Sequence, residues 1–169
     1  MDKAIRMNRA KEIIEKILYI TIATVDEKGQ PWNSPVYSAF DEAYNFYWFS
    51  DKNSQHSRNI RNNKKIFLVI YDSSVAEGTG EGVYIQAEAH ELNDKKHVLD
   101  GLKIMDERAG KTKVRKYEKF SGGAPLRVYA ATPTKIWMNL EDEDENGNYI
   151  KDIRVEVPLK ELKELFNES

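Results

Sequence analysis

The sequence predicts a mainly β protein, a small closed or partly closed β-barrel with added helices. Five or six segments are rich in β-branched and aromatic residues, and short turns join most of them, which is typical of an antiparallel barrel. Helical patterns occur at both ends of the chain and between the late strands. The 169 residues contain no linker and suffice for one domain, residues 1–169, with its own core. An OB-like or SH3-like barrel fits this pattern too.

The first half of the chain predicts two helices and four strands. Apolar residues recur at helical spacing over residues 3–16, and a basic helix is expected within residues 53–63. Strands are expected at residues 18–25, 31–40, 46–49 and 65–72. Pro35 interrupts the second of these, because proline cannot donate to a ladder, so we expect that strand at an edge or with a bulge. The fourth is almost uniformly apolar and is therefore expected to be central.

The second half alternates strands with helices. A strand with one apolar and one partly polar face is expected over residues 83–92, followed by a helix over residues 93–108 that Asn93 caps. A second helix is expected around residues 114–120 from apolar residues about three apart. The remaining elements are a long strand or strand pair over 126–139 broken by Pro133, a strand over 153–157 and a helix over 159–166. The acidic run 141–145 predicts a solvated turn, with a dimer contact as the alternative.

Composition excludes several classes of function. The chain has no cysteine, so it has no disulfide and no thiolate catalysis, and its three scattered histidines form no metal-ligand pattern. A formal net charge of -2 argues against a general nucleic-acid binder. The mean hydropathy of -0.68 and the absence of a long apolar run predict no membrane span. Without a signal-peptide pattern at the N-terminus, we expect a cytoplasmic protein.

The stretch from Ser50 to Asn63 is the strongest candidate for a binding site. Five basic residues lie between Ser50 and Lys65 against the single acid Asp51, in a chain that is mildly acidic overall. A helix N-terminus offers unpaired backbone N–H groups and positive dipole charge, and Ser50, Ser54 and Ser57 add hydroxyl donors. This chemistry suits a phosphate. A capped, solvent-exposed basic helix without a ligand is the alternative.

Three stretches together resemble the pyridoxamine 5′-phosphate oxidase-like family of FMN-binding split barrels. They are IATVDEKGQPWNSPVY (residues 22–37), FYWFSDKNSQHSRNIRNN (residues 46–63) and ATPTKIW (residues 131–137). The resemblance covers residues 18–92 well, and residues 131–137 look like the family's final barrel strand. It implies a six-stranded antiparallel Greek-key split barrel that forms a homodimer, with two FMN molecules in grooves at the subunit interface.

The resemblance also assigns cofactor-binding roles to individual residues. One set matches the strand along which relatives lay the flavin ring: Trp32, Asn33, Ser34, Pro35 and Val36. A second set matches the contacts to the ribityl chain and phosphate: Phe49, Ser50, Ser54, Gln55 and His56. Trp137 looks like a late aromatic residue near the flavin of the partner subunit, with a core or interface position as the alternative.

The phosphate site departs from the family pattern at two positions. Many relatives place Arg-Lys directly after the serine that corresponds to Ser54, where this chain has Gln55 and His56. Histidine can donate to a phosphate, and a nearby dianion favours its charged form, but its charge depends on pH. We therefore expect weaker phosphate binding than in those relatives. A surface polar role for His56 beside the helix cap is the alternative.

The resemblance implies an FMN-dependent oxidoreductase that acts on an unknown small molecule. The flavin would carry the hydride or electron transfer, and no residue stands out as nucleophile or general base, so the catalytic residues are unknown. Glu88 and Glu91 are expected to be surface charges of a strand. The alternative is a non-catalytic dimeric module that binds flavin, deazaflavin or haem. No metal ligands are expected.

Overall fold

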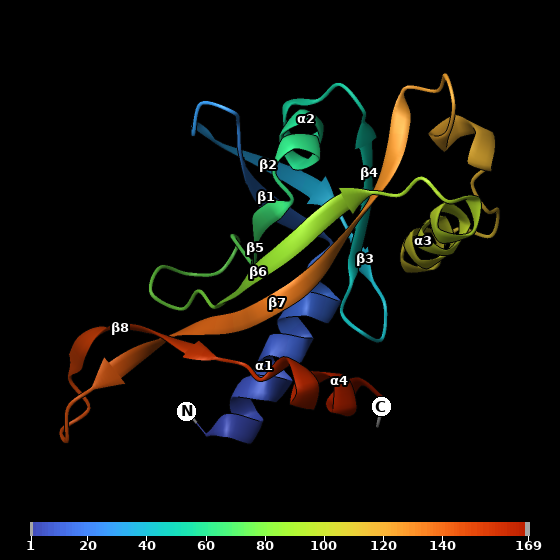
Figure 1. Cartoon of the computed structure of the whole chain (residues 1–169). Helices are drawn as coiled ribbons and strands as arrows, with labels where there is room; N and C mark the ends of the chain where they lie inside the picture. The colour runs from blue at the N-terminus through green and yellow to red at the C-terminus, as the bar shows by residue number, and fades with distance from the viewer. Residues whose placement is uncertain (1, 168–169) are drawn as a thin grey trace.

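The structure is a computed structural model that describes residues 2–167 (Figure 1). The helices are α1 (Lys3–Lys16), α2 (Gln55–Asn62), α3 (Lys95–Arg108) and α4 (Leu159–Asn167), with a single 3-10 turn, η1 (Tyr117–Phe120). The strands are β1 (Tyr19–Val25), β2 (Pro31–Tyr37), β3 (Ala39–Phe40), β4 (Phe46–Asp51), β5 (Lys65–Tyr71), β6 (Gly82–Glu91), β7 (Leu126–Glu143) and β8 (Tyr149–Glu156).

The eight strands form one antiparallel sheet that returns on itself. Their order is β2-β1-β5-β6-β7-β4-β3, and β8 pairs with β7 outside this path. Only Ser38 separates β2 from β3, so the two ends of the order are consecutive parts of one bent strand. With β2 and β3 counted as one strand, six strands form the barrel, and β8 lies outside it as an addition to β7. The predicted split-barrel class is confirmed, although the sheet has eight strands rather than six.

Alternation along the strands builds the core. In β1 and β5 every second side chain is buried, and in β6 the run Val83, Ile85, Ala87 and Ala89 points inward as predicted. Strand β5 lies between β1 and β6, which confirms its predicted central position. Such a two-residue period buries one face of each strand and leaves the other for contacts outside the barrel.

Two prolines behave differently from the expectation. Strand β2 runs through Pro35, which pairs with Thr21, and the break falls at Ser38 instead. The strand tolerates Pro35 because β2 has only one neighbour, β1, in agreement with the predicted edge position. Strand β7 is likewise continuous through Pro133, where the register with β6 shifts between Gln86 and Ala87. A bulge there takes the place of the expected break.

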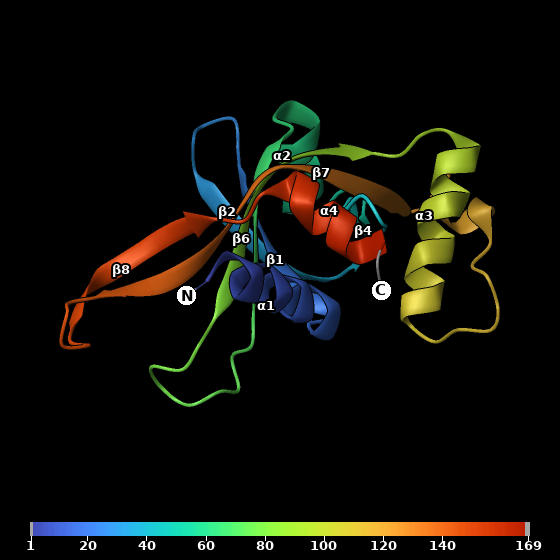
Figure 2. The ribbon, with the colours of Figure 1, turned by 90° about the horizontal axis from the view of Figure 1, so that it is seen from below.

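The helices cover two parts of the barrel (Figure 2). Helices α1 and α4 lie side by side and pack into the main core through Ile13, Ile14 and Leu162. Helix α3 lies at the end of the molecule opposite β8, where Val98, Leu102 and other apolar residues pack with η1 against β4 and β7 in a second cluster.

Two predictions about this second cluster were wrong. Helix α3 begins at Lys95 and is capped by Asp94, not Asn93, because the Asp94 carboxylate accepts from the backbone N–H groups of Lys96 and His97. The expected second helix is the single turn η1. Its apolar residue Phe120 packs in this cluster, so the three-residue apolar spacing reflects packing rather than a long helix.

The acidic run belongs partly to a strand. Strand β7 extends to Glu143, and the turn to β8 is made by residues 144–148 with Gly147 at φ 78°. The β7–β8 hairpin projects from the body of the protein (Figures 1 and 2). The expected last strand and helix are confirmed as β8 and α4.

Candidate functional site

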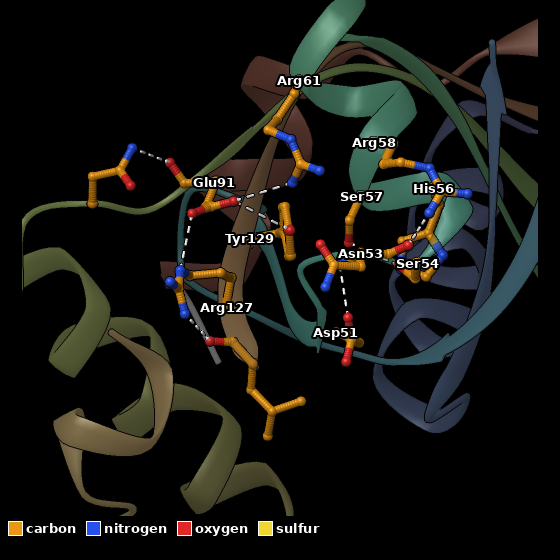
Figure 3. A network of polar contacts seen from close by, with 12 residues as sticks. Asp51, Asn53, Ser54, His56, Ser57, Arg58, Arg61, Glu91, Arg127 and Tyr129 are labelled. Carbon is orange, nitrogen blue, oxygen red and sulfur yellow. Dashed lines mark hydrogen bonds and ion pairs between the residues drawn. The ribbon is translucent and has the colours of Figure 1, made fainter. Parts of the chain in front are cut away.

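The N-terminus of α2 lies directly after β4 and is not capped by a side chain. Asp51 at the end of β4 holds the connecting turn, since its carboxylate accepts from the Asn53 N–H at 2.7 Å. Ser54 occupies the N-cap position, but its hydroxyl donates to the hydroxyl of Ser57 at 2.8 Å instead of capping the helix (Figure 3). The backbone donors of the first turn are therefore not satisfied by the usual cap, which suits an anion.

The side chains of Arg58 and Gln55 are hydrogen-bonded to each other beside this first turn. The Arg58 guanidinium donates to the backbone carbonyl of Asn53 and, at 2.5 Å, to the side-chain oxygen of Gln55. Gln55 in turn donates to Asn59 at 2.8 Å, which donates to Thr24 of β1 at 2.9 Å. The network places a fixed positive charge beside the helix N-terminus.

His56 is buried and hydrogen-bonded through both ring nitrogens. Its Nε2 lies 3.1 Å from the Ser54 hydroxyl, and its Nδ1 lies 3.2 Å from the Ser34 hydroxyl on β2. Only 9% of the residue is exposed, and burial lowers the pKa of His56 below its usual range. The expected surface alternative for His56 is wrong. Donation to a phosphate would require the ring to exchange one of these two partners.

The β2 residues that the resemblance assigns to the flavin ring form an outward-facing edge. Trp32, Asn33 and Pro35 are exposed, and the indole N–H of Trp32, itself 49% exposed, donates to the Ser34 hydroxyl at 3.0 Å. Val36 is the exception, because its side chain is buried in the main core. The structure thus brings Trp32, Ser34, Ser54 and His56 into one connected group.

Phe49 and Trp137 lie apart from that group. Phe49 packs edge-to-face against Phe120 at 5.4 Å between ring centroids, with the Arg115 guanidinium 4.9 Å from its ring, so it belongs to the second hydrophobic cluster. Ser50, its neighbour on β4, is half-buried. Trp137 stacks on Phe67 of β5 with centroids 6.4 Å apart.

Glu91 is not the surface charge that we expected from the sequence. Its carboxylate is 3.2 Å from Arg127 Nε and 3.7 Å from an Arg61 guanidinium nitrogen, and its side chain is only 18% exposed. It also accepts from the Tyr129 hydroxyl at 3.3 Å (Figure 3). These partners lie on α2 and β7, far from Glu91 in the sequence, so no local pattern could have indicated them.

A shallow groove of about 430 Å³ runs over the outer face of the sheet. The strand register places Ala23, Phe67, Gln86 and Lys135 in one row across β1, β5, β6 and β7. Three of these residues line the groove: Ala23, Phe67 and Gln86. Arg154 lies beside this face, with its guanidinium 4.3 Å from the Tyr84 ring.

Among residues 2–167, no three His, Asp or Glu side chains are grouped so that they could hold a metal ion. No helix among the described residues is long and apolar enough to span a membrane.

The antiparallel barrel and the basic helix after its fourth strand define the split-barrel class of proteins. Within that class, the family model described as pyridoxamine 5′-phosphate oxidase matches residues 7–139. This chain belongs to that family. The recognition from the three sequence stretches is therefore confirmed.

Solved structures agree on the fold. A 5-nitroimidazole antibiotic resistance protein from Bacteroides thetaiotaomicron is similar with a TM-score of 0.64 at 14% identity, over 78% of this chain and 81% of that one. The haem storage protein HutZ from Vibrio cholerae matches with a TM-score of 0.64 at 18% identity, over 76% and 91%. An F420 reductase matches with a TM-score of 0.55 at 18% identity, over 75% and 94%.

These relatives share the barrel but differ in the ligands that their descriptions give. At such low identity the likeness concerns the fold alone. A search of curated protein sequences found no match to this chain.

Proposed function

We propose that this protein binds FMN and acts as a flavin-dependent oxidoreductase on a small molecule. The observation that carries the proposal is the N-terminus of α2, where Ser54 stands at the cap position but turns its hydroxyl away from the helix backbone. Arg58 adds a charge held over the same turn. A phosphate would satisfy the free backbone donors and the positive end of the helix dipole.

The exposed edge of β2 supplies a place for the ring of the cofactor. Trp32, Asn33 and Pro35 present side chains and backbone outward there, and Ser34 connects this edge to His56 beside the phosphate position. FMN, when bound, supplies the hydride or electron transfer, and the protein binds and orients it. The two parts of the site therefore match the two parts of the cofactor.

We further propose that the protein is a homodimer whose partner covers the outer face of the sheet. Phe67, Trp137 and Tyr84 lie on that face, and Phe67 also lines the groove described above. Exposed aromatic residues such as Tyr19 and Tyr71, 64% and 48% exposed, extend across the same sheet. Aromatic side chains of this kind are enriched in interfaces between proteins.

A second candidate is a dimeric module that binds a deazaflavin or haem. Both ring nitrogens of His56 are engaged inside the protein, which removes one expected phosphate donor. An F420 reductase and a haem storage protein share the fold.

A visible absorption spectrum of the purified protein, before and after addition of FMN, tests the two candidates. Bound flavin bands, quenched flavin fluorescence and a dimer on gel filtration would support the first. A protein that neither carries flavin nor quenches added FMN would contradict it, and titrations with F420 and haem would then test the second.

A double variant tests the location of the phosphate site. Ser54→Ala combined with His56→Ala should weaken FMN binding at least about tenfold, because it removes two polar side chains from the first turn of α2. The matched control is Ser73→Ala combined with His97→Ala, since both of these side chains are exposed outside the site. Equal FMN affinity in the double variant and the wild type would place the phosphate elsewhere.

A further inference from the structure

Two patches of opposite charge lie at opposite ends of the molecule. The acidic tip is the end of the β7–β8 hairpin, residues 141–152, which contains six acidic residues and the single base Lys151. The basic segment runs from the end of α3 into η1, residues 109–119, and contains five basic residues and the single acid Glu118. Figure 2 shows the hairpin at one end and the segment between α3 and η1 at the other. The two patches therefore cannot meet within one chain.

The acidic tip has little compensating positive charge of its own. Glu141 and Asp152 are directly opposite each other in the β7–β8 register, and neither forms an ion pair with any residue in the described range 2–167. Among the described side chains the tip forms one ion pair, between Lys151 and Asp142 at 4.0 Å. Like charges at opposite positions of two strands repel each other. A cation from another molecule would relieve this repulsion.

The turn holds the acidic tip in a defined shape. The Asp144 carboxylate accepts from the backbone N–H groups of Asn146 and Asn148, each at 2.8 Å, and from the Asn148 side chain at 2.9 Å. Tyr149 and Ile150, 59% and 53% exposed, add apolar surface beside the charges. A preformed tip of this kind loses little conformational entropy when it docks.

One base anchors the basic segment to α3, and the other four are exposed. Arg115 pairs with the Asp106 carboxylate, and the backbone N–H of Arg115 donates to the same carboxylate at 2.8 Å. Val114, 61% exposed, lies next to Arg115 in the segment. The four exposed bases form no ion pair with any residue that the structure describes: Lys111, Lys113, Lys116 and Lys119.

The two patches match in layout as well as in charge. Each has exposed apolar side chains, Val114 in one and Tyr149 with Ile150 in the other, bordered by charges of one sign. An apolar centre with a polar rim is the usual arrangement of protein interfaces, and complementary charge favours the encounter. A nucleic acid or an anionic membrane could use the basic segment, but it would leave the unpaired acids of the tip without a role.

We propose that the acidic tip of one copy docks on the basic segment of a second copy. The contact joins two different patches, so it is heterologous and can repeat from copy to copy. It uses surfaces other than the groove and the aromatic residues that we assigned to the homodimer, and it needs no cofactor. The acidic tip also lies outside residues 7–139, which the family model matches.

Sedimentation velocity at several protein concentrations measures the association. The wild type should form larger species at about 0.02 M salt than at about 0.5 M salt, because salt screens interactions between exposed charges. A dimer that persists at high salt is the pairing proposed above, and the association is then counted from that dimer. A wild type that sediments alike at both salt concentrations, at every protein concentration, would overturn the proposal.

Charge reversal locates the contact. The tip variant, Glu141→Lys with Glu145→Lys, and the segment variant, Lys113→Glu with Lys116→Glu, should each associate at least about tenfold more weakly than the wild type. Both leave Asp144 and Arg115 intact, so the turn and the anchor remain.

Mixing the two variants separates a specific contact from a general effect of net charge. An equimolar mixture should recover association, because the acidic tip of one variant then meets the basic segment of the other. The control Lys28→Glu with Lys160→Glu makes the same charge change at exposed positions outside both patches and should keep the wild-type association. A mixture that associates no better than its components would refute the contact. Binding of the wild type to anionic vesicles or to DNA without self-association would refute it too.

Discussion

Arg108 of α3 donates through Nη2 to the backbone carbonyl of Ile17, the residue that caps the C-terminus of α1, at 3.0 Å. The same nitrogen lies 2.9 Å from the carbonyl of Ile14 and 3.0 Å from that of Glu15. A positive charge at a helix C-terminus is favourable, and here it joins two helices that the chain separates by about 80 residues.

Replacing Arg108 should therefore destabilise the fold. Arg108→Ala removes the donor to these carbonyls and the contact with the Phe40 ring, which lies 4.7 Å from the guanidinium. We expect a loss of about 2 kcal/mol in the free energy of unfolding, measured by urea denaturation. Lys103→Ala, an exposed position on the same helix, should change stability by less than about 0.5 kcal/mol. Equal effects of the two variants would contradict the capping role.

Gly101 allows α3 to approach the sheet. A Cβ atom at this position would lie 3.1 Å from a ring carbon of Tyr47 and 3.3 Å from a methyl group of Val128. Gly101→Ala should therefore destabilise the protein by about 1 kcal/mol, although alanine favours a helix. Gly123→Ala is the control, because a Cβ there meets no atom within 4 Å. Thermal unfolding of the two variants compares their stabilities directly. A Gly101→Ala variant more stable than the wild type would show that Tyr47 and Val128 can move to accommodate the added methyl group.

The sequence predicted most of the barrel because its signals were local. Strands β1, β5 and β6 show the alternation that their burial then confirms, and the turn at Asp26 to Gly29 has a glycine at φ 81° as its position requires. The cap of α3 was predicted wrongly because two neighbouring residues can both cap a helix. Asp94 caps it instead of Asn93, since its carboxylate accepts from two backbone N–H groups.

Only part of the candidate site could be predicted from the sequence. The basic helix after β4 was predicted, and β2 lies at an edge of the sheet, as the sequence indicated. The contacts of Glu91 could not be found, because its partners Arg61, Arg127 and Tyr129 lie on α2 and β7. Sequence patterns report on one strand or helix at a time, and these contacts join three elements.

His56 should make stability depend on pH. Burial lowers the pKa of His56 below its ordinary value of about 6.5, so the unfolded chain binds the proton more readily than the folded protein. The stability that the neutral ring contributes is complete above about pH 6.5 and is lost as the pH falls toward the lower folded-state pKa. His90, whose pKa is also lowered by burial, should add to the same trend.

The measurement is the free energy of unfolding from pH 7.5 down to pH 5 in wild type and in His56→Gln. The variant should lose less stability than the wild type over this range, although it starts from a lower value. The exposed substitution His97→Gln serves as the control and should keep the wild-type slope. A slope unchanged in His56→Gln would show that the ring does not resist protonation in the folded state.

Gln55 offers a direct way to strengthen the proposed phosphate site. It stands in the first turn of α2, at a position where the family resemblance places arginine in many relatives, and its side-chain oxygen accepts from Arg58. Gln55→Arg adds a charge that can bind a phosphate in a bidentate manner, and we expect FMN affinity to rise about tenfold. Fluorescence quenching of FMN measures this. The control is Asn62→Arg at the opposite end of the same helix, which adds the same charge far from the N-terminus and should change affinity less than about twofold. An equal gain in both variants would mean that net charge alone, and not the α2 N-terminus, attracts the phosphate.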